Sequence, residues 1–279
     1  MRVAFQGEPG AYANLAAREA LPKALAVPRS SFEDALGALR EGEADLAIIP
    51  VENSLHGRIA DIHHLLPESH LFIVGEHFHR VRHQLLGIKG ARLSDIRTVY
   101  SQAPALGQCR KIIRERNLVA RSWHDTAGAA RHVAELRDPS AAAIASSLAA
   151  ELYGLEILKA DIEDEFHNVT RFLVMSREAA HAARDSGPVI TSFVFRVRNV
   201  PAALYKALGG FATNGVNMTK LESYQLGGSF NATQFYADIE GHPEEGRVRL
   251  AFEELQFFTS LLTILGAYPA HPFRSRMPG

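Results

Sequence analysis

Residues 45–54 read DLAIIPVENS, a short apolar run that ends in charged and small polar side chains. A continuous apolar run of this length is typical of a strand that is buried on both faces. The same theme recurs along the first 175 residues, where further apolar runs each lead into small polar residues and an amphipathic helical pattern. These runs occupy residues 2–6, 71–75, 85–88, 98–100, 120–123 and 141–145. The alternation predicts an α/β fold with largely parallel sheets.

Small polar residues stand where these predicted strands end and the next helices begin. In open α/β sheets ligands bind outside the carboxyl ends of the strands, and helix N-termini at that edge favour anions. Each such residue alone is more often a helix cap than a ligand. Together they indicate a site for a small, polar, anionic molecule. The set comprises Asn53, Ser54, Ser101, Gln102, Thr126, Ser146 and Ser147.

Residues 176–188 (SREAAHAARDSGP) interrupt this pattern and predict a domain boundary. The remainder has the order strand, helix, strand, strand, helix, strand, which is the ferredoxin-like βαββαβ motif. The predicted strands are 189–198, 216–225, 230–239 and 261–267, and the helices are 202–211 and an apolar stripe from Val248 to Phe258. A hairpin is expected across Gly227 and Gly228.

Two helix starts are predicted from local signals. Ser30 with Glu33 three residues later has the pattern of a capping box. Pro201 suits the first position of a helix. Farther along, Leu106, Cys109 and Ile113 share one helical face and are expected to be buried together.

Composition excludes several classes of protein. Lys and Arg total 30 and Asp and Glu total 31 among 279 residues, so the net charge of -1 argues against a nucleic-acid partner. Cys109 is the single cysteine, which excludes an intrachain disulfide. No apolar run reaches the ~18 residues that span a bilayer, and the first residues do not form a signal peptide. We therefore expect a cytoplasmic protein that handles small molecules and has no membrane partner.

Three short segments are distinctive. Residues 51–54 (VENS) are followed by Gly57, residues 167–172 read HNVTRF, and residues 221–225 read LESYQ. The first two segments, with Ser101 and Gln102 between them, closely resemble the V-E-N-S and N-x-T-R-F motifs of the prephenate dehydratases. The C-terminal part resembles the ACT regulatory module attached to those enzymes.

The resemblance implies a two-lobed, periplasmic-binding-protein-like catalytic domain at residues 1–178, followed by a ferredoxin-like ACT domain at residues 188–279. Lobe one would comprise about 1–76 and 163–178, and lobe two about 77–162. It also implies conversion of prephenate to phenylpyruvate with loss of water and carbon dioxide, in phenylalanine biosynthesis and without a cofactor. Two alternatives stay open: an arogenate dehydratase, and a non-catalytic two-lobed regulator that binds an amino acid.

The resemblance assigns the chemistry to Thr170, Glu52, Arg171 and Phe172. Thr170 would contact the departing hydroxyl as a hydrogen-bond donor or relay. Glu52 would be an acid or a structural carboxylate, and Arg171 would bind a substrate carboxylate or form a structural salt bridge. Phe172 would pack on the substrate ring or in the core. The substrate carboxylates would be held by Asn53, Ser54, Ser101, Gln102 and Thr126.

Other candidates carry less weight. His167 is a secondary candidate for the acid, because histidine is the side chain whose ordinary titration range includes neutral pH. Seven histidines between positions 56 and 83 raise the possibility of a metal site. Only His77 and His79 have the spacing that places them on the same face of a strand, and no set of Asp or Glu ligands completes a site. We therefore expect no bound metal. Cys109 is interpreted as a packing residue.

The resemblance also implies that phenylalanine binds the ACT domain as a feedback inhibitor, and that these domains pair to give a homodimer or a homotetramer. Here the helix entry reads Ala202-Ala203-Leu204 where the family has G-A-L, and Tyr224-Gln225 stand where it has R-P. We expect altered affinity or selectivity, or a purely structural pairing module. The effector-binding candidates are Ala203, Leu204, Asn214, Asn217, Met218, Glu222 and Ser223.

Overall fold

The computed structural model describes residues 1–225 and 232–276. The chain divides into two compact units. The N-terminal unit comprises Met1–Arg58 and Phe78–Phe172, and the C-terminal unit comprises Ile59–His77 and Leu173–Gly279. Strands β5 (Phe72–Arg80) and β11 (Val169–Ser176) contribute residues to both units. The lobe and domain boundaries stated above stay predictions. Among the described residues, no helix has the length and apolar character needed to cross a membrane.

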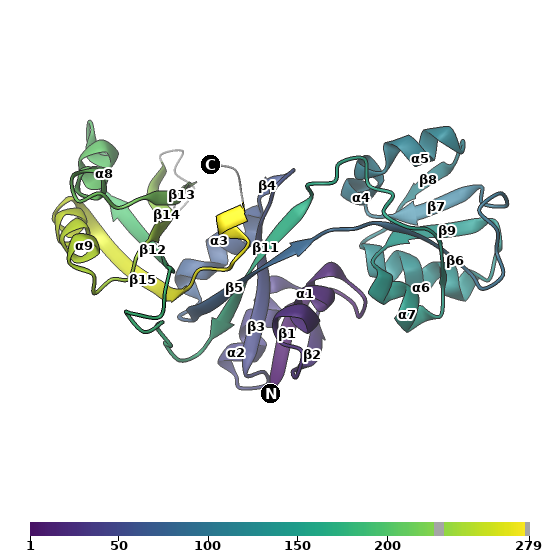
Figure 1. Cartoon of the computed structure of the whole chain (residues 1–279), viewed down its shortest axis with the longest axis horizontal. Coiled ribbons are helices and arrows are strands. Elements are labelled where there is room, and N and C mark those ends of the chain that lie inside the picture. The colour runs from purple at the N-terminus through teal and green to yellow at the C-terminus, as the bar shows by residue number, and fades with distance from the viewer. Residues whose placement is uncertain (226–231, 277–279) are drawn as a thin grey trace. The chain divides into compact units, whose positions relative to one another are not determined.

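In the first sheet of the N-terminal unit, β1 (Arg2–Gln6) runs parallel to β2 (Leu25–Arg29) and to β3 (Leu46–Asn53), as the alternating pattern predicts, whereas the short β4 (Gly57–Arg58) is antiparallel to β3 (Figure 1). Val3 pairs with both Ala26 and Leu46, so β1 lies between β2 and β3. The buried side chains of this unit include Val3, Phe5, Ile48 and Phe172, which pack with helix α1. The elements are β1 (Arg2–Gln6), α1 (Tyr12–Ala20), β2 (Leu25–Arg29), α2 (Phe32–Arg40), β3 (Leu46–Asn53) and β4 (Gly57–Arg58).

The second sheet of this unit is mixed. Strand β7 runs parallel to β8 and β9, whereas β6 is antiparallel to β9 and to β10, giving the order β10-β6-β9-β7-β8. Strand β9 (AAAIA) is buried along its whole length, which fits a central strand covered on both faces. The strands are β6 (Gln84–Gly87), β7 (Thr98–Ser101), β8 (Val119–Ser122), β9 (Ala141–Ala145) and β10 (Glu156–Lys159). The helices are α4 (Ala103–Gln108), α5 (Arg110–Glu115), α6 (Thr126–Leu136) and α7 (Ser147–Tyr153).

The C-terminal unit contains the predicted βαββαβ order, which the structure confirms. Its sheet is antiparallel with the order β13-β14-β12-β15, and α8 and α9 pack on it through stacked and edge-on rings of Phe193, Phe211 and Phe252. The elements are α3 (Ala60–Leu65), η1 (Leu66–Glu68), β12 (Val189–Val197), α8 (Ala203–Thr213), β13 (Met218–Gln225), β14 (Ala232–Glu240), α9 (Gly246–Phe258), β15 (Thr259–Pro269) and η2 (Arg274–Arg276). The hairpin expected at Gly227 and Gly228 lies outside the described residues.

Three local predictions were wrong in position. The cap of α2 is Ser31, whose extended backbone lets its side chain accept from the Asp34 amide at 3.0 Å. Helix α8 begins at Ala203 and not at Pro201 or Ala202, because Ala202 adopts a left-handed φ of 61° and therefore lies outside the helix. The helix expected around Cys109 is two short helices, since the backbone of Cys109 leaves the helical region.

Candidate active site

The VENS and NVTRF segments meet through the Asn53 side chain. Its oxygen Oδ1 accepts the backbone N–H groups of Leu55 and His56 at 3.0 and 3.1 Å, which fixes the orientation of the amide. Its nitrogen Nδ2 then donates to Asn168 Oδ1 at 2.7 Å and to Thr170 Oγ1 at 3.0 Å. Thr170 is 9% exposed. Because Thr170 Oγ1 accepts from Asn53, its own hydroxyl hydrogen remains available to be donated to a further acceptor.

Ser54 joins the same two segments through the backbone. Its hydroxyl donates to the His167 carbonyl at 2.7 Å and accepts from the Val169 amide at 2.9 Å, and the Ser54 amide donates to the Val169 carbonyl. These bonds hold the end of β3 against the start of β11. Ser54 is therefore fixed as part of the loop framework that positions Asn53 and Thr170.

Arg171 and Glu52 form an ion pair beside this junction. Arg171 Nη1 lies 2.9 Å from Glu52 Oε1, and the Arg171 side chain is 3% exposed, whereas that of Glu52 is 31% exposed. A guanidinium at this distance stabilises the carboxylate as an anion. The geometry therefore favours the salt-bridge interpretation of Arg171. Phe172 is 2% exposed and packs with Val3 and Phe5, which favours a place in the core.

A chain of hydrogen bonds extends inward from Asn168 to residues that the sequence analysis missed. Asn168 Nδ2 donates to Gln108 Oε1 at 3.1 Å, and His83 Nε2 lies 2.6 Å from the same oxygen. Gln108 Nε2 lies 2.6 Å from His56 Nε2, and the Tyr12 hydroxyl lies 2.7 Å from His83 Nδ1. We call this set, with Asn53 and Thr170, the Asn53 network.

Comparison with known proteins identifies the family. Residues 3–180 match the family model described as prephenate dehydratase. A relative from Komagataeibacter europaeus, named bifunctional N-acyl-homoserine lactone acylase/prephenate dehydratase, is 52% identical over 98% of both chains.

The chain belongs to the prephenate dehydratase family.

Two further similarities fit that assignment. A Petunia hybrida protein named arogenate dehydratase 2 is 38% identical over 97% of this chain and 72% of its own length. A solved prephenate dehydratase from Arthrobacter aurescens, in complex with L-Phe, covers 100% of this chain and 92% of its own, with 30% identity and a TM-score of 0.89. The relatives of this chain therefore include proteins named for prephenate and proteins named for arogenate.

The other expected substrate ligands of this prephenate dehydratase family member lie where β7 ends and where helices α4 and α6 begin. The Ser101 hydroxyl is buried and donates to the Ile144 carbonyl at 2.7 Å. Thr126 is the first residue of α6 and is 3% exposed, and the cap of that helix is Asp125, which accepts from the Gly128 amide at 2.7 Å. Gln102 precedes α4 and its side chain does not cap it. Thus Ser101 stabilises the sheet, and the roles of Gln102 and Thr126 stay predictions.

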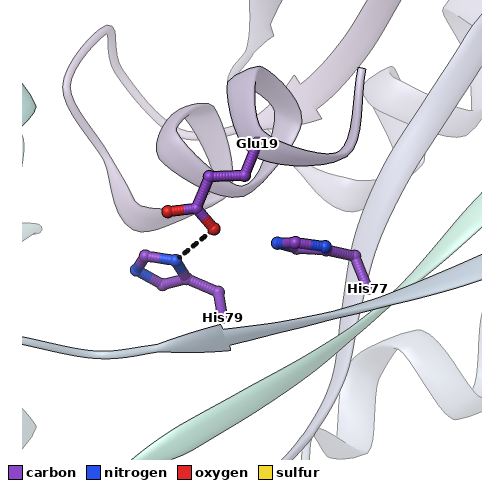
Figure 2. Close-up of side chains that lie close together, drawn as sticks. All are labelled: Glu19, His77 and His79. Carbon is purple, nitrogen blue, oxygen red and sulfur yellow. Dashed lines mark hydrogen bonds and ion pairs between the residues drawn. The ribbon is translucent and has the colours of Figure 1, made fainter. Parts of the chain in front are cut away.

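Histidine and cysteine chemistry also occurs outside the Asn53 network. Burial raises the pKa of the Cys109 thiol, aided by the Asp164 and Glu163 charges, which fits a packing residue. Within the described part of the chain, one group of side chains has ligand atoms close enough together to hold a metal ion: Glu19, His77 and His79 (Figure 2), within 4.8 Å of one another. The Glu19 carboxylate already bonds His79 Nδ1 at 2.9 Å, so a cation would have to displace that bond. Glu19 was missed because it lies far from the histidines in sequence.

His167 is more than half exposed, with Nδ1 3.8 Å from a Glu165 oxygen. Its backbone carbonyl accepts the hydrogen bond from the Ser54 hydroxyl. The main chain of His167 therefore helps to join the two motifs, and the role of its ring as an acid stays a prediction.

The predicted effector residues lie at different places in the C-terminal unit. Ala203 and Leu204 line a cavity of about 260 Å³ together with Arg198, Tyr205 and Phe235. The remaining five lie on or before β13 or at the end of α8. Two of them are amides that bond carboxylates: Asn214 Nδ2 donates to Glu254 at 2.9 Å and Asn217 Nδ2 donates to Glu240 at 3.1 Å. Met218 packs on the core of the unit. On β13, Glu222 forms an ion pair with Lys220 at 3.2 Å, and Ser223 is the strand partner of Phe235 on β14.

Proposed function

We propose that this protein catalyses the decarboxylating dehydration of prephenate to phenylpyruvate. The family assignment supports the reaction class. The observation that carries the residue assignment is the bond from Asn53 Nδ2 to Thr170 Oγ1, because it turns the Thr170 hydroxyl into an oriented donor. In this proposal Thr170 donates to the hydroxyl group that leaves the substrate ring.

The reaction needs a donor at that atom. The bond between the ring and one carboxylate breaks and releases carbon dioxide, and its electron pair moves through the ring. The carbon–oxygen bond at the opposite ring position then breaks, and the ring becomes aromatic. The departing hydroxide takes up a proton and leaves as water. Hydroxide is a poor leaving group, and a positioned donor typically contributes ~10²–10⁴-fold to such a step.

Glu52 and Arg171 have a supporting role in this proposal. Their ion pair neutralises the guanidinium, and it places a partly exposed carboxylate next to Asn53 on β3. The Gln102 amide and the Thr126 hydroxyl are the proposed contacts for the substrate carboxylates, since the Asn53 amide already donates to Asn168 and Thr170.

The test compares Thr170→Val with Thr170→Ser in a prephenate turnover assay. Thr170→Val keeps the shape and removes the hydroxyl, so we expect kcat to fall by ~10²–10⁴-fold with a smaller change in KM. Thr170→Ser keeps a donor and should retain much more activity. Thr98→Val on β7 is the matched control and should behave as wild type. Equal kcat in Thr170→Val and wild type would contradict the role of Thr170, and no turnover by wild type would favour a non-catalytic regulator.

The choice between prephenate and arogenate is settled by comparing kcat/KM for the two substrates. Relatives with each name match this chain at 38% to 52% identity. We propose prephenate as the preferred substrate. A higher kcat/KM with arogenate would replace this assignment and leave the role of Thr170 unchanged.

We further propose that the βαββαβ unit is an ACT-type regulatory domain that binds L-phenylalanine and pairs between subunits. The complex of the Arthrobacter aurescens relative with L-Phe supports the effector, and the cavity beside Ala203 and Leu204 supports a place for it. Calorimetric titration with L-phenylalanine should release heat, and sedimentation should show a dimer or a tetramer. No heat with any aromatic amino acid would remove the effector proposal. The cytoplasmic location stays a prediction.

Hydrolysis of N-acyl-homoserine lactones is a second candidate, favoured by the 52% identity to the bifunctional relative. The buried Cys109 thiol is unsuited to be its nucleophile, because the raised pKa that burial causes keeps it protonated. Release of homoserine lactone from an acylated lactone measures this activity. Thr170→Val separates the two reactions, since loss of dehydration with retained acyl hydrolysis would place the second activity elsewhere.

A further inference from the structure

The direction of each hydrogen bond in the Asn53 network follows from two backbone groups. The amides of Leu55 and His56 can only donate, so Asn53 Oδ1 accepts and Asn53 Nδ2 donates. Asn168 Oδ1 is therefore an acceptor and Asn168 Nδ2 a donor, and Gln108 Oε1 must accept from it at 3.1 Å. No freedom of amide orientation is left in this part of the network.

The same logic fixes the proton on His83. Since Gln108 Oε1 only accepts, the His83 nitrogen 2.6 Å away must carry a hydrogen, which makes it Nε2–H. His83 is 1% exposed, and burial lowers its pKa, so the ring is neutral and Nδ1 has only a lone pair. The Tyr12 hydroxyl lies 2.7 Å from Nδ1 and 3.1 Å from the Arg82 carbonyl oxygen, so it directs its single hydrogen to the nearer Nδ1 and is the donor in that bond.

Tyr12 is suited to stay protonated as this donor. Its pKa is raised, chiefly by burial, with further contributions from Cys109 and Glu163. The Glu163 carboxylate also accepts a hydrogen bond from the backbone N–H of His83 at 2.9 Å, so the main chain of His83 is held in place as well as its ring. On the opposite side of the network, Gln108 Nε2 donates to His56 Nε2.

We propose that Tyr12 and His83 are positioning residues for the dehydration reaction. Tyr12 donates to Nδ1 of the Nε2–H tautomer of His83 and so holds the ring, and His83 then holds the Gln108 oxygen toward Asn168. Asn168 accepts from Asn53 Nδ2 and so supports the orientation, set by the Leu55 and His56 amides, in which Asn53 donates to Thr170 Oγ1. Neither Tyr12 nor His83 contacts the substrate in this scheme. The inference rests on the proposed function for its kinetic effect, but the tautomer of His83 is independent of that function.

The experiment uses Tyr12→Phe, with Tyr153→Phe as the matched control. Tyr153 also donates its hydroxyl at 2.7 Å, but to the Pro9 carbonyl outside the network. Loss of one hydrogen-bond donor corresponds to about a tenfold change, so we expect Tyr12→Phe to lower kcat about tenfold with KM within about twofold. Tyr153→Phe should keep the wild-type kcat.

The spectroscopic measurement is a ¹⁵N–¹H correlation spectrum of the histidine rings in the full chain. Wild type should show His83 protonated on Nε2 alone, and Tyr12→Phe should keep that tautomer but shift the Nδ1 signal, because this nitrogen loses its hydrogen-bond donor. A second pair of variants tests His83 itself: His83→Gln retains an N–H donor at the position of Nε2 and should keep more kcat than His83→Leu.

Three outcomes would overturn the proposal: a His83 ring protonated on Nδ1 or on both nitrogens in wild type, a wild-type kcat in Tyr12→Phe, or equal kcat in His83→Gln and His83→Leu. If wild type does not turn over prephenate, the proposed function fails, and the spectrum still decides the tautomer.

Discussion

Each unit of the molecule contains a polar cluster that is at least partly buried, and the two clusters are built from different chemistry. The Asn53 network uses neutral amides, hydroxyls and imidazole rings. The C-terminal unit contains what we call the Arg274 cluster: Arg274, Glu76, Asp238, Ser192, Tyr236 and Tyr268. There Arg274 bonds Glu76 through Nε and Nη2 at 2.7 and 2.9 Å, and its Nη2 lies 4.0 Å from Asp238.

The difference separates a site that presents a donor from one that holds a fold together. A buried charge needs a counter-charge, and Arg274 supplies one that Glu76 and Asp238 share. Neutral groups cost less to bury, and a directed chain of them can end on a donor, as it does at Thr170. We therefore expect changes in the Arg274 cluster to act on stability, and changes in the Asn53 network to act first on turnover.

The largest expected effect is that of Arg274→Met. The side chains of Glu76 and Asp238 are fully buried, and removing the guanidinium deprives both carboxylates of their shared counter-charge. Breaking a buried ion pair in this way costs about 3–5 kcal/mol. Denaturant unfolding should show this loss in the free energy of unfolding, while kcat of the remaining folded protein stays near wild type.

Arg184→Met is the control for that variant, because Arg184 is exposed and should change stability by less than about 0.5 kcal/mol. The double variant Arg274→Met with Glu76→Leu should recover part of the loss, since it removes one of the two buried charges. A loss below about 1 kcal/mol in Arg274→Met would show that the two clusters do not differ in this way.

A pair of serine substitutions compares the clusters at a smaller scale. Ser192 is fully buried, donates to Asp238 at 2.5 Å and accepts from the hydroxyls of Tyr236 and Tyr268 at 3.1 and 2.7 Å. Ser192→Ala deprives three buried groups of a partner and should cost about 1–3 kcal/mol. Ser54→Ala should cost less than about 1 kcal/mol because Ser54 is exposed and water can replace its hydroxyl. Equal losses in urea unfolding would contradict the comparison.

The sequence was informative where a local pattern determines the structure. The run at residues 141–145 became β9 with the same bounds, and the βαββαβ order followed from strand and helix periodicity. Strand β2 was missed because it contains Pro28 and no fully buried residue, so it has little hydrophobic signal. Strand β10 was missed for the same lack of burial.

The site was predicted in part, for a related reason. The VENS and NVTRF motifs identified Asn53 and Thr170, which the structure joins directly. Gln108, His83 and Tyr12 were missed because their contacts span 25 to 71 residues of sequence and depend on side-chain direction rather than on spacing. Helical spacing indicated a buried face at Cys109, one residue from Gln108. Nothing in a periodic pattern distinguishes a buried amide that bonds a histidine from one that faces water.

The smallest expected effect is on the pH dependence of stability, and it tests whether the Asn53 network is neutral. Burial lowers the pKa of folded His83 below its ordinary value of 6.5, so the unfolded chain binds a proton that the folded chain rejects. Stability from this group is therefore complete above pH 6.5 and is lost as the pH falls toward the folded pKa, by at most about 1.4 kcal/mol per pH unit. His83→Gln removes that contribution, so the stability difference between wild type and His83→Gln should shrink from pH 7.5 to pH 5.5 in urea unfolding. A difference that stays constant or grows would mean that the ring accepts a proton in place, and the neutral character that distinguishes the Asn53 network from the Arg274 cluster would be lost.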